Sequence, residues 1–78
     1  MSVTAYVLIQ TEVGRAEKVA KAARGIPGVV DADNVAGPYD VIVKAESSSL
    51  DDLGKLVVSE IQKVEGITRT FTCPVVHL

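Results

Sequence analysis

The apolar residues of this chain switch between the spacing of a strand and the spacing of a helix, and the order of the switches leaves few folds open. Short runs rich in β-branched and aromatic residues alternate with stretches in which apolar residues recur every three or four positions. The pattern predicts, in chain order, strand 3–10, helix 14–24, strand 29–36, strand 39–45, helix 49–64 and strand 67–76. The apolar stripe expected on the second helix consists of Leu50, Leu53, Val57, Ile61 and Val64.

The two halves of this pattern echo each other, since "IPGVV" follows the first predicted helix and "VEGIT" follows the second. Two split βαβ units joined by a hairpin make the ferredoxin-like βαββαβ sandwich. Right-handed crossovers then place both helices on one face of a four-stranded antiparallel sheet, with the first and third strands central. Pro74 and an irregular alternation near Asp33 and Asn34, which indicates a bulge or an edge strand, fall on the edge strands. We therefore predict a single α+β domain, residues 1–78, with this fold.

The sheet has apolar residues on the face that the helices do not cover. If Val41, Val43 and Ala45 face the helices, Ile42 points the other way, and the first strand is apolar on both of its faces. A domain of 78 residues with 47% hydrophobic residues and a mean hydropathy of +0.29 is marginal alone and is expected to cover such a face. We predict a dimer formed through the sheets. The alternative is that polar residues such as Lys44 keep the face wet.

The composition excludes several supports and partners. One cysteine permits no internal disulfide, and one histidine offers no metal-ligand spacing, so neither a metal nor another cofactor is expected. A net charge of −2 without a basic cluster argues against direct binding of nucleic acid. No apolar run approaches the roughly 20 residues that span a bilayer, and the N-terminus lacks signal-peptide features. A free thiol with these features favours the cytoplasm.

No residue type or spacing indicates a catalytic residue. His77 is the penultimate residue, where a base seldom has an orienting partner. Cys73 has no basic neighbour in the sequence, and we expect a buried structural thiol. Thr68, Thr70 and Thr72 alternate, so their hydroxyls share one face of the last predicted strand. Ordinary strand propensity is the simpler explanation of these threonines, and the alternative is that their hydroxyls hydrogen-bond a small polar ligand near the sheet edge.

The stretch "VAGPYDVIVKA" joins the second and third predicted strands and is the best candidate for a binding site. Gly37 and Pro38 are what a turn requires, since glycine permits a positive φ and proline fixes its own φ. We expect the tight turn to leave backbone groups of both residues unpaired. Asp40 is less easily explained, because aspartate is disfavoured in strands. A carboxylate beside turn amides offers an acceptor for an ammonium group and donors for a carboxylate, the two groups of an amino acid.

The chain also resembles a known family. The sequence "IPGVVDADNVAGPYDVIVKAE", followed by a helix and "VEGITRTFTCPVV", resembles the effector-binding half of the Lrp/AsnC transcription regulators, called the RAM domain. The resemblance covers essentially the whole chain. It is carried by Pro27-Gly28-Val29, the Gly37-x-Tyr39-Asp40 hairpin, and Gly66-Ile67 with Thr70-x-Thr72.

The resemblance implies a ferredoxin-like fold, dimers formed through the sheets, and rings of dimers of the octamer type. It also implies an amino acid or related effector bound where dimers meet, around the hairpin. Gly37, Tyr39 and Asp40 match the ligand-side turn of the family, with Pro38 as part of the same turn, and Thr70 and Thr72 match threonines of the last strand. Full-length members begin with a helix-turn-helix segment, whereas the first predicted strand here starts at Val3. We therefore expect a stand-alone module that modulates transcription by associating with full-length regulators.

Two other classes of function stay open at this point. Small dimeric ferredoxin-like enzymes, such as monooxygenases and isomerases, use a cleft between sheet and helices, for which this chain offers only Tyr6 and Tyr39. An ACT-like regulatory domain has the same strand order and also binds amino acids, but it normally accompanies an enzyme on the same chain.

Overall fold

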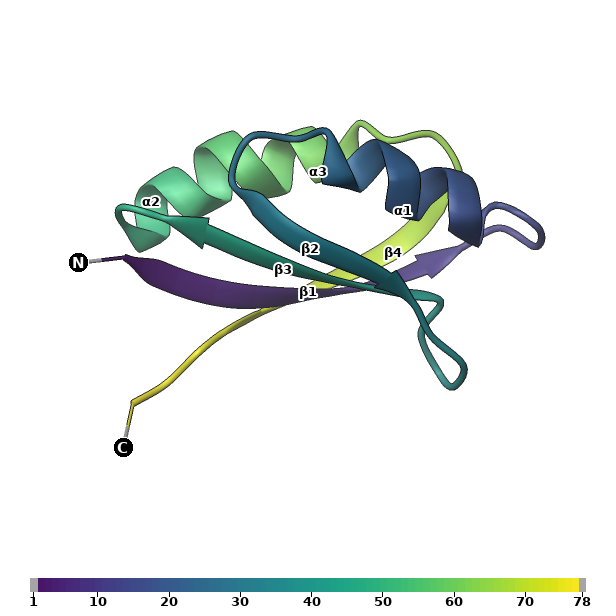
Figure 1. Cartoon of the computed structure of the whole chain (residues 1–78), viewed down its shortest axis with the longest axis horizontal. Coiled ribbons are helices and arrows are strands. Elements are labelled where there is room, and N and C mark those ends of the chain that lie inside the picture. Colours follow the sequence, from purple (N-terminus) through teal and green to yellow (C-terminus); the bar gives the residue numbers. More distant parts are fainter. Residues whose placement is uncertain (1, 78) are drawn as a thin grey trace.

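The protein is a two-layer sandwich of one sheet and two helical stretches (Figure 1). The computed structural model describes residues 2–77, apart from the side chain of Leu56. The elements in chain order are β1 (Val3–Thr11), α1 (Ala16–Arg24), β2 (Val29–Asn34), β3 (Val41–Ser47), α2 (Leu50–Asp52), η1 (Leu53–Val58), α3 (Ser59–Gln62) and β4 (Ile67–Pro74). This is the predicted α+β order, because α2, η1 and α3 follow one another as a single helical stretch.

The sheet has the order β2-β3-β1-β4, and each neighbouring pair is antiparallel. The first and third strands are therefore central and the second and fourth are edges, as predicted. β2 is an edge strand, as one of the two interpretations of its irregular alternation predicted, and it also carries a bulge, but not near Asp33 and Asn34. The pairing with β3 shifts between Val29 and Asp31, while Asp33 and Asn34 pair regularly with Ile42 and Val41.

Alternation along the two central strands builds the core. Ala5, Val7 and Ile9 of β1 are fully buried, and the register pairs them with Ala45, Val43 and Val41 of β3. The helices add a buried set consisting of Val19, Ala20, Ala23, Leu53, Val57 and Ile61. Figure 1 shows both helical stretches on the same side of the sheet, so all of these side chains meet in one layer. The opposite face carries no helix among the described residues.

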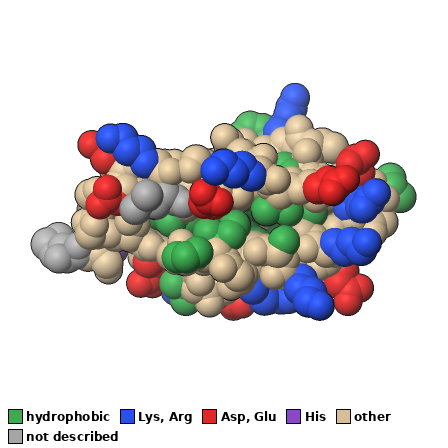
Figure 2. Space-filling model, turned by 90° about the horizontal axis from the view of Figure 1, so that it is seen from above, with side chains coloured by type: hydrophobic (Ala, Val, Ile, Leu, Met, Phe, Trp, Pro, Cys, Tyr) green, Lys and Arg blue, Asp and Glu red, His purple; other side chains and the backbone are tan. Residues whose placement is uncertain are grey.

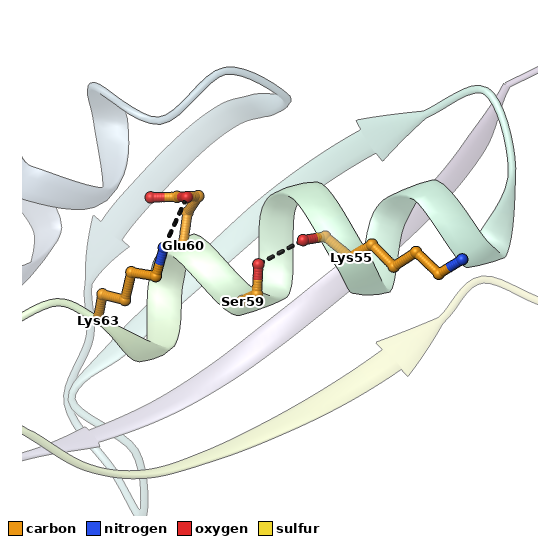
Figure 3. A network of polar contacts seen from close by, with 4 residues as sticks. All are labelled: Lys55, Ser59, Glu60 and Lys63. Carbon is orange, nitrogen blue, oxygen red and sulfur yellow. Dashed lines mark hydrogen bonds and ion pairs between the residues drawn. The ribbon is translucent and has the colours of Figure 1, made fainter.

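The second helical stretch departs from a regular α-helix. Ser49 caps it, since its hydroxyl accepts a hydrogen bond from the N–H of Asp52 at 3.1 Å. Further along, the N–H of Ser59 donates to the carbonyl of Gly54, five residues back, which is π-helical spacing. The Ser59 hydroxyl donates to the carbonyl of Lys55 (Figure 3). Leu50 was expected in the apolar stripe, but its side chain is 55% exposed.

Among the described residues, no helix has the length and apolar character needed to cross a membrane.

Candidate functional site

The hairpin between β2 and β3 is fastened to the end of β1 by Asp40. The N–H of Val35 donates to the carbonyl of Asp40 at 3.0 Å and closes the loop. The N–H of Asp40 donates to the carbonyl of Ile9 at 2.9 Å, and its carboxylate oxygen Oδ2 accepts from the N–H of Thr11 at 2.8 Å. The half-buried Asp40 therefore braces the hairpin with its backbone and its side chain. A carboxylate has further acceptor positions, so this bond does not use up its capacity.

The loop folds over the sheet face that the helices leave uncovered, and we call this the open face. Figure 1 shows the loop projecting on that side of the sheet. Gln10 points its amide at the loop, and Nε2 donates to the carbonyl of Pro38 at 3.1 Å. The ring of Tyr39 meets the ring of Phe71 edge to face, with centroids 5.9 Å apart. The Arg69 guanidinium lies 5.7 Å from the centroid of the same Phe71 ring.

Gly37 is at the exposed tip of this loop. Its φ of +142° is a conformation that L side chains rarely adopt, and a Cβ placed on it would meet no atom within 4 Å. The space around the tip is therefore open to another molecule. Unpaired backbone groups were expected at both Gly37 and Pro38, but the Pro38 carbonyl is engaged by Gln10.

The open face is mixed in character, with an apolar centre. Directly paired residues of antiparallel strands share a face. The register thus places on it Thr4, Tyr6, Leu8 and Gln10 of β1, Ile42, Lys44 and Glu46 of β3, and Arg69, Phe71 and Cys73 of β4. Tyr6 is 41% exposed and Phe71 is 43% exposed, while Leu8 and Ile42 are half-buried, with Leu8 between Ile42 and Phe71. Large apolar side chains in contact with solvent on one face are typical of an interaction surface.

The prediction of a buried thiol is wrong, because Cys73 is exposed. It pairs with Tyr6, so it lies on the open face, where no described helix covers it. Alternation alone could not tell which side of β4 would be covered. His77 is exposed as well. The described residues contain no group of three or more His, Cys, Asp or Glu side chains that could hold a metal ion.

The threonines of β4 lie on the other side of the sheet. Thr70 pairs with Ile9 and Thr72 pairs with Val7, and both partners face the helices. The structure therefore brings Pro38 and Tyr39 together with Gln10 and Phe71, but it does not bring Thr70 and Thr72 onto the same face.

Gln10 and Phe71 are partners of the hairpin that were not predicted from the sequence. One signal was present: Phe71 is one residue from Thr70 and Thr72, so it had to point to the opposite face. What the sequence did not show is that the loop folds back over that face.

The chain is thus a ferredoxin-like α+β sandwich with one uncovered sheet face and a hairpin braced over it. Comparison with known proteins identifies the family. The family described as the Lrp/AsnC ligand binding domain matches residues 4–77, and the chain belongs to it.

Curated relatives support this assignment. An uncharacterised HTH-type transcriptional regulator of Pyrococcus furiosus is 32% identical over 79 residues, which cover 92% of this chain and 50% of the relative. A similar regulator of Pyrococcus horikoshii is 28% identical over 75 residues, with the same coverage. The chain thus spans about half the length of the curated relatives that it matches.

Solved structures share the fold. The protein TTHA0845 of Thermus thermophilus superposes with a TM-score of 0.88 at 29% identity, covering 97% of this chain and 95% of that one. AsnC of E. coli superposes with a TM-score of 0.86 at 21% identity, covering 97% and 52% of the two chains. A Neisseria meningitidis transcriptional regulator in complex with L-Met gives a TM-score of 0.81 at 16% identity, covering 96% and 50%.

Proposed function

We propose that this chain is an oligomeric regulatory module that binds an amino acid, or a closely related small molecule, at the hairpin 35–40. The observation that carries the proposal is the fastening of the hairpin over the open face. Asp40 and Gln10 tie the loop to β1, and Tyr39 ties it to Phe71. A loop held in this way presents an exposed tip beside a surface suited to association.

The open face is the proposed dimer surface. Tyr6 and Phe71 supply large exposed apolar area, and aromatic residues are enriched at the centres of protein interfaces. Covering apolar area is worth about 25 cal/mol per Å², which favours pairing of two such faces across a twofold axis. Lys44 and Glu46 lie on the same face and set its register with a partner.

Light scattering at micromolar concentration tests the dimer. Phe71→Asp places a charge among the apolar side chains of the open face and is expected to yield a monomer of 8.2 kDa. Leu50→Asp is the matched control, because Leu50 is also exposed but lies on the helix-bearing side. If the unmodified chain is already monomeric, or if both variants dissociate equally, the open face is not the interface.

The proposed ligand is an amino acid for two reasons. Asp40 is a carboxylate beside an exposed turn, which suits an ammonium group, and a relative of the same fold is a regulator solved with L-Met. Thr70 and Thr72 face away from the hairpin within one chain, so their hydroxyls join the site only from a neighbouring copy. The site therefore lies where dimers meet, and rings of dimers, of the octamer type, are the assemblies that would complete it.

Calorimetric titration with each of the standard amino acids tests the ligand. Saturable binding of a small subset supports the proposal. Gly37→Val should abolish it by straining the tip, whereas Gly54→Val adds a side chain on the helix-bearing side, where a Cβ would meet no atom within 4 Å, and should leave affinity unchanged. Failure of every amino acid to bind the assembled oligomer would refute the ligand class without affecting the dimer.

We further propose that the module affects transcription by mixed assembly with full-length Lrp/AsnC-type regulators. The support is that the curated relatives are HTH-type regulators with a matching half. Co-expression with such a regulator, followed by affinity capture and a DNA-binding assay, tests this. Absence of co-purification, with the DNA binding of the regulator unchanged, would contradict it.

We propose binding rather than catalysis. The side chains left for a catalytic cleft were Tyr6 and Tyr39, and both lie on the open-face side, away from the space between sheet and helices.

A further inference from the structure

The two edge strands of the sheet differ in what happens to their outward backbone groups. In β2, the N–H of Val35 bonds to the carbonyl of Asp40, and because bonded pairs alternate, the N–H and C=O of Ala32 point away from β3. Oδ1 of Asp31 accepts from that N–H at 2.9 Å. Nη2 and Nε of Arg24 donate to the Ala32 carbonyl at 2.7 and 3.0 Å. The chain thus closes this edge with its own side chains.

The outer edge of β4 has no such closure among the described residues. The N–H of Val75 donates to the carbonyl of Thr4 at 2.8 Å, and the regular register alternates back along the strand from this pair. Phe71 therefore bonds to β1, while the N–H and C=O groups of Thr70 and Thr72 point outward. None of the hydrogen bonds found within the described part of the chain engages these outward groups.

Charge does not protect this edge either. Natural edge strands are often blunted by charged side chains, and β2 carries Asp31 and Asp33. Residues 70–74 of β4 include no charged side chain, and all of them are exposed except the half-buried Thr70. Figure 2 shows acidic and basic side chains spread over the helix-bearing side, so that surface differs from the uncharged edge. An exposed and unpaired edge strand without charges is a template for pairing with another strand.

From this contrast we infer that β4 pairs edge to edge with β4 of a second copy of the chain, antiparallel about a twofold axis at Phe71. In this register the N–H and C=O of each Thr70 meet those of the partner's Thr72. Phe71 lies opposite the partner's Phe71 with Cα atoms about 4.5 Å apart, and aromatic cross-strand pairs are favourable. A second copy is the partner that fits, because the sequence Thr-Phe-Thr at 70–72 is the same in both directions.

This edge contact is separate from the open-face dimer proposed above. It extends the sheet sideways, whereas the open-face contact stacks one sheet on another. Tyr6 is on the central strand β1, so a charge at Tyr6 disrupts only the open face, while a charge at Phe71 disrupts both contacts. The two contacts can therefore be removed one at a time.

Thr72→Pro tests the edge contact most directly. Proline removes the outward N–H without removing a bond to β1, its ring occupies the place of the partner strand, and Pro74 is already accepted at an outward position. Thr72→Val is the matched control, because it keeps the N–H and the strand propensity.

Amide hydrogen exchange followed by NMR reports the pairing. The Thr70 amide should exchange roughly tenfold or more slowly in the unmodified chain and in Thr72→Val than in Thr72→Pro. The Asn34 amide, which points outward from β2, should exchange equally fast in all three. A slow Phe71 amide in Thr72→Pro verifies that the bonds between β4 and β1 are intact.

Light scattering gives an independent measurement. Tyr6→Asp should remain a dimer held by the edge, and Tyr6→Asp combined with Thr72→Pro should be a monomer of 8.2 kDa. The inference is overturned if Tyr6→Asp alone is monomeric, or if the Thr70 amide exchanges at the same rate in the unmodified chain and in Thr72→Pro. Failure of the open-face contact or of amino-acid binding would leave the expected results unchanged.

Discussion

Asp40 has two conceivable roles, brace and ligand contact, and substitution separates them. In the structure Oδ2 accepts from the N–H of Thr11 at 2.8 Å. A hydrogen bond to a charged acceptor contributes about 1.5–3 kcal/mol, and Asp40→Ala should lose an amount near the lower end because the site is only half-buried. For 78 residues the whole free energy of unfolding is about 4–12 kcal/mol, so this loss is readily measured by urea denaturation.

Asp40→Asn removes the charge but keeps an amide oxygen that can accept from Thr11. The brace then becomes a neutral hydrogen bond, and the unfolding free energy should fall by only about 1 kcal/mol. An ammonium contact would not survive this change, because the amide oxygen carries no net charge. Amino-acid affinity should therefore fall roughly tenfold or more if Asp40 contacts the ligand.

The combination of measurements decides between the two roles. If the Asp40→Asn variant retains both its assembly and its amino-acid affinity, Asp40 only braces the hairpin. Loss of affinity with an unchanged oligomer shows direct ligand contact. If Asp40→Ala leaves stability, assembly and affinity all unchanged, the brace inferred from the 2.8 Å contact is refuted.

Three further predictions concern other parts of the chain. Gly28→Ala should lower the free energy of unfolding by about 2–4 kcal/mol in urea titrations, because it adds a clash with Val57 to the backbone strain. Gly14→Ala adds backbone strain alone and should lower it by about 1–2 kcal/mol. Equal losses in the two variants would contradict the packing argument. Cys73 should react slowly with a thiol reagent in the oligomer and rapidly in the Phe71→Asp variant, because it lies on the open face; equal rates would place the interface elsewhere. The 78-residue chain should show no gel shift with DNA at low salt, given its net charge of −2; saturation at submicromolar protein would contradict this.

The fold was predictable because each element carries its own period. The period identifies β1 and β3 as strands without any knowledge of their neighbours. It does not identify the core face of β1, because that strand is apolar on both faces, and only the structure shows that Ala5, Val7 and Ile9 are the buried set. Departures occurred where tertiary contacts override local pattern. Leu50 continues the helical stripe in sequence, yet it lies in the first turn of the helical stretch and stays exposed.

The site was predictable only in part. Glycine and proline mark a turn at 37–38 because their backbone preferences are local. The fold-back of the loop depends on contacts between residues far apart in the chain, such as Gln10 with Pro38 and Tyr39 with Phe71. No single-residue preference encodes such pairs. The π-helical register at Ser59 was not predicted from the sequence either. The Ser59 hydroxyl donates to the Lys55 carbonyl, which in a regular α-helix accepts a hydrogen bond from the N–H of Ser59.

The contacts of the hairpin lead to a last prediction, that ligand binding and dimerisation are coupled. Tyr39 belongs to the hairpin, while its partner Phe71 is exposed on the open face, so a ligand that moves the loop also changes the surface that pairs. Coupling of two binding free energies is reciprocal. If one bound amino acid tightens the dimer by some factor, the dimer must bind that one amino acid more tightly than the monomer does, by the same factor.

Titrating the amino acid at protein concentrations above and below the dimer dissociation constant measures this factor. Tyr39→Leu keeps apolar bulk but removes the edge-to-face ring contact. In this variant the monomer and the dimer should bind the amino acid with nearly equal affinity. Tyr6→Leu is the matched control, because Tyr6 is exposed on the same face and its ring makes no stacking contact with the hairpin among the described residues. It should weaken the dimer yet leave the ratio of affinities unchanged. A ratio near one in the unmodified protein would show that the hairpin and the open face act independently, whatever the contact between their aromatic rings.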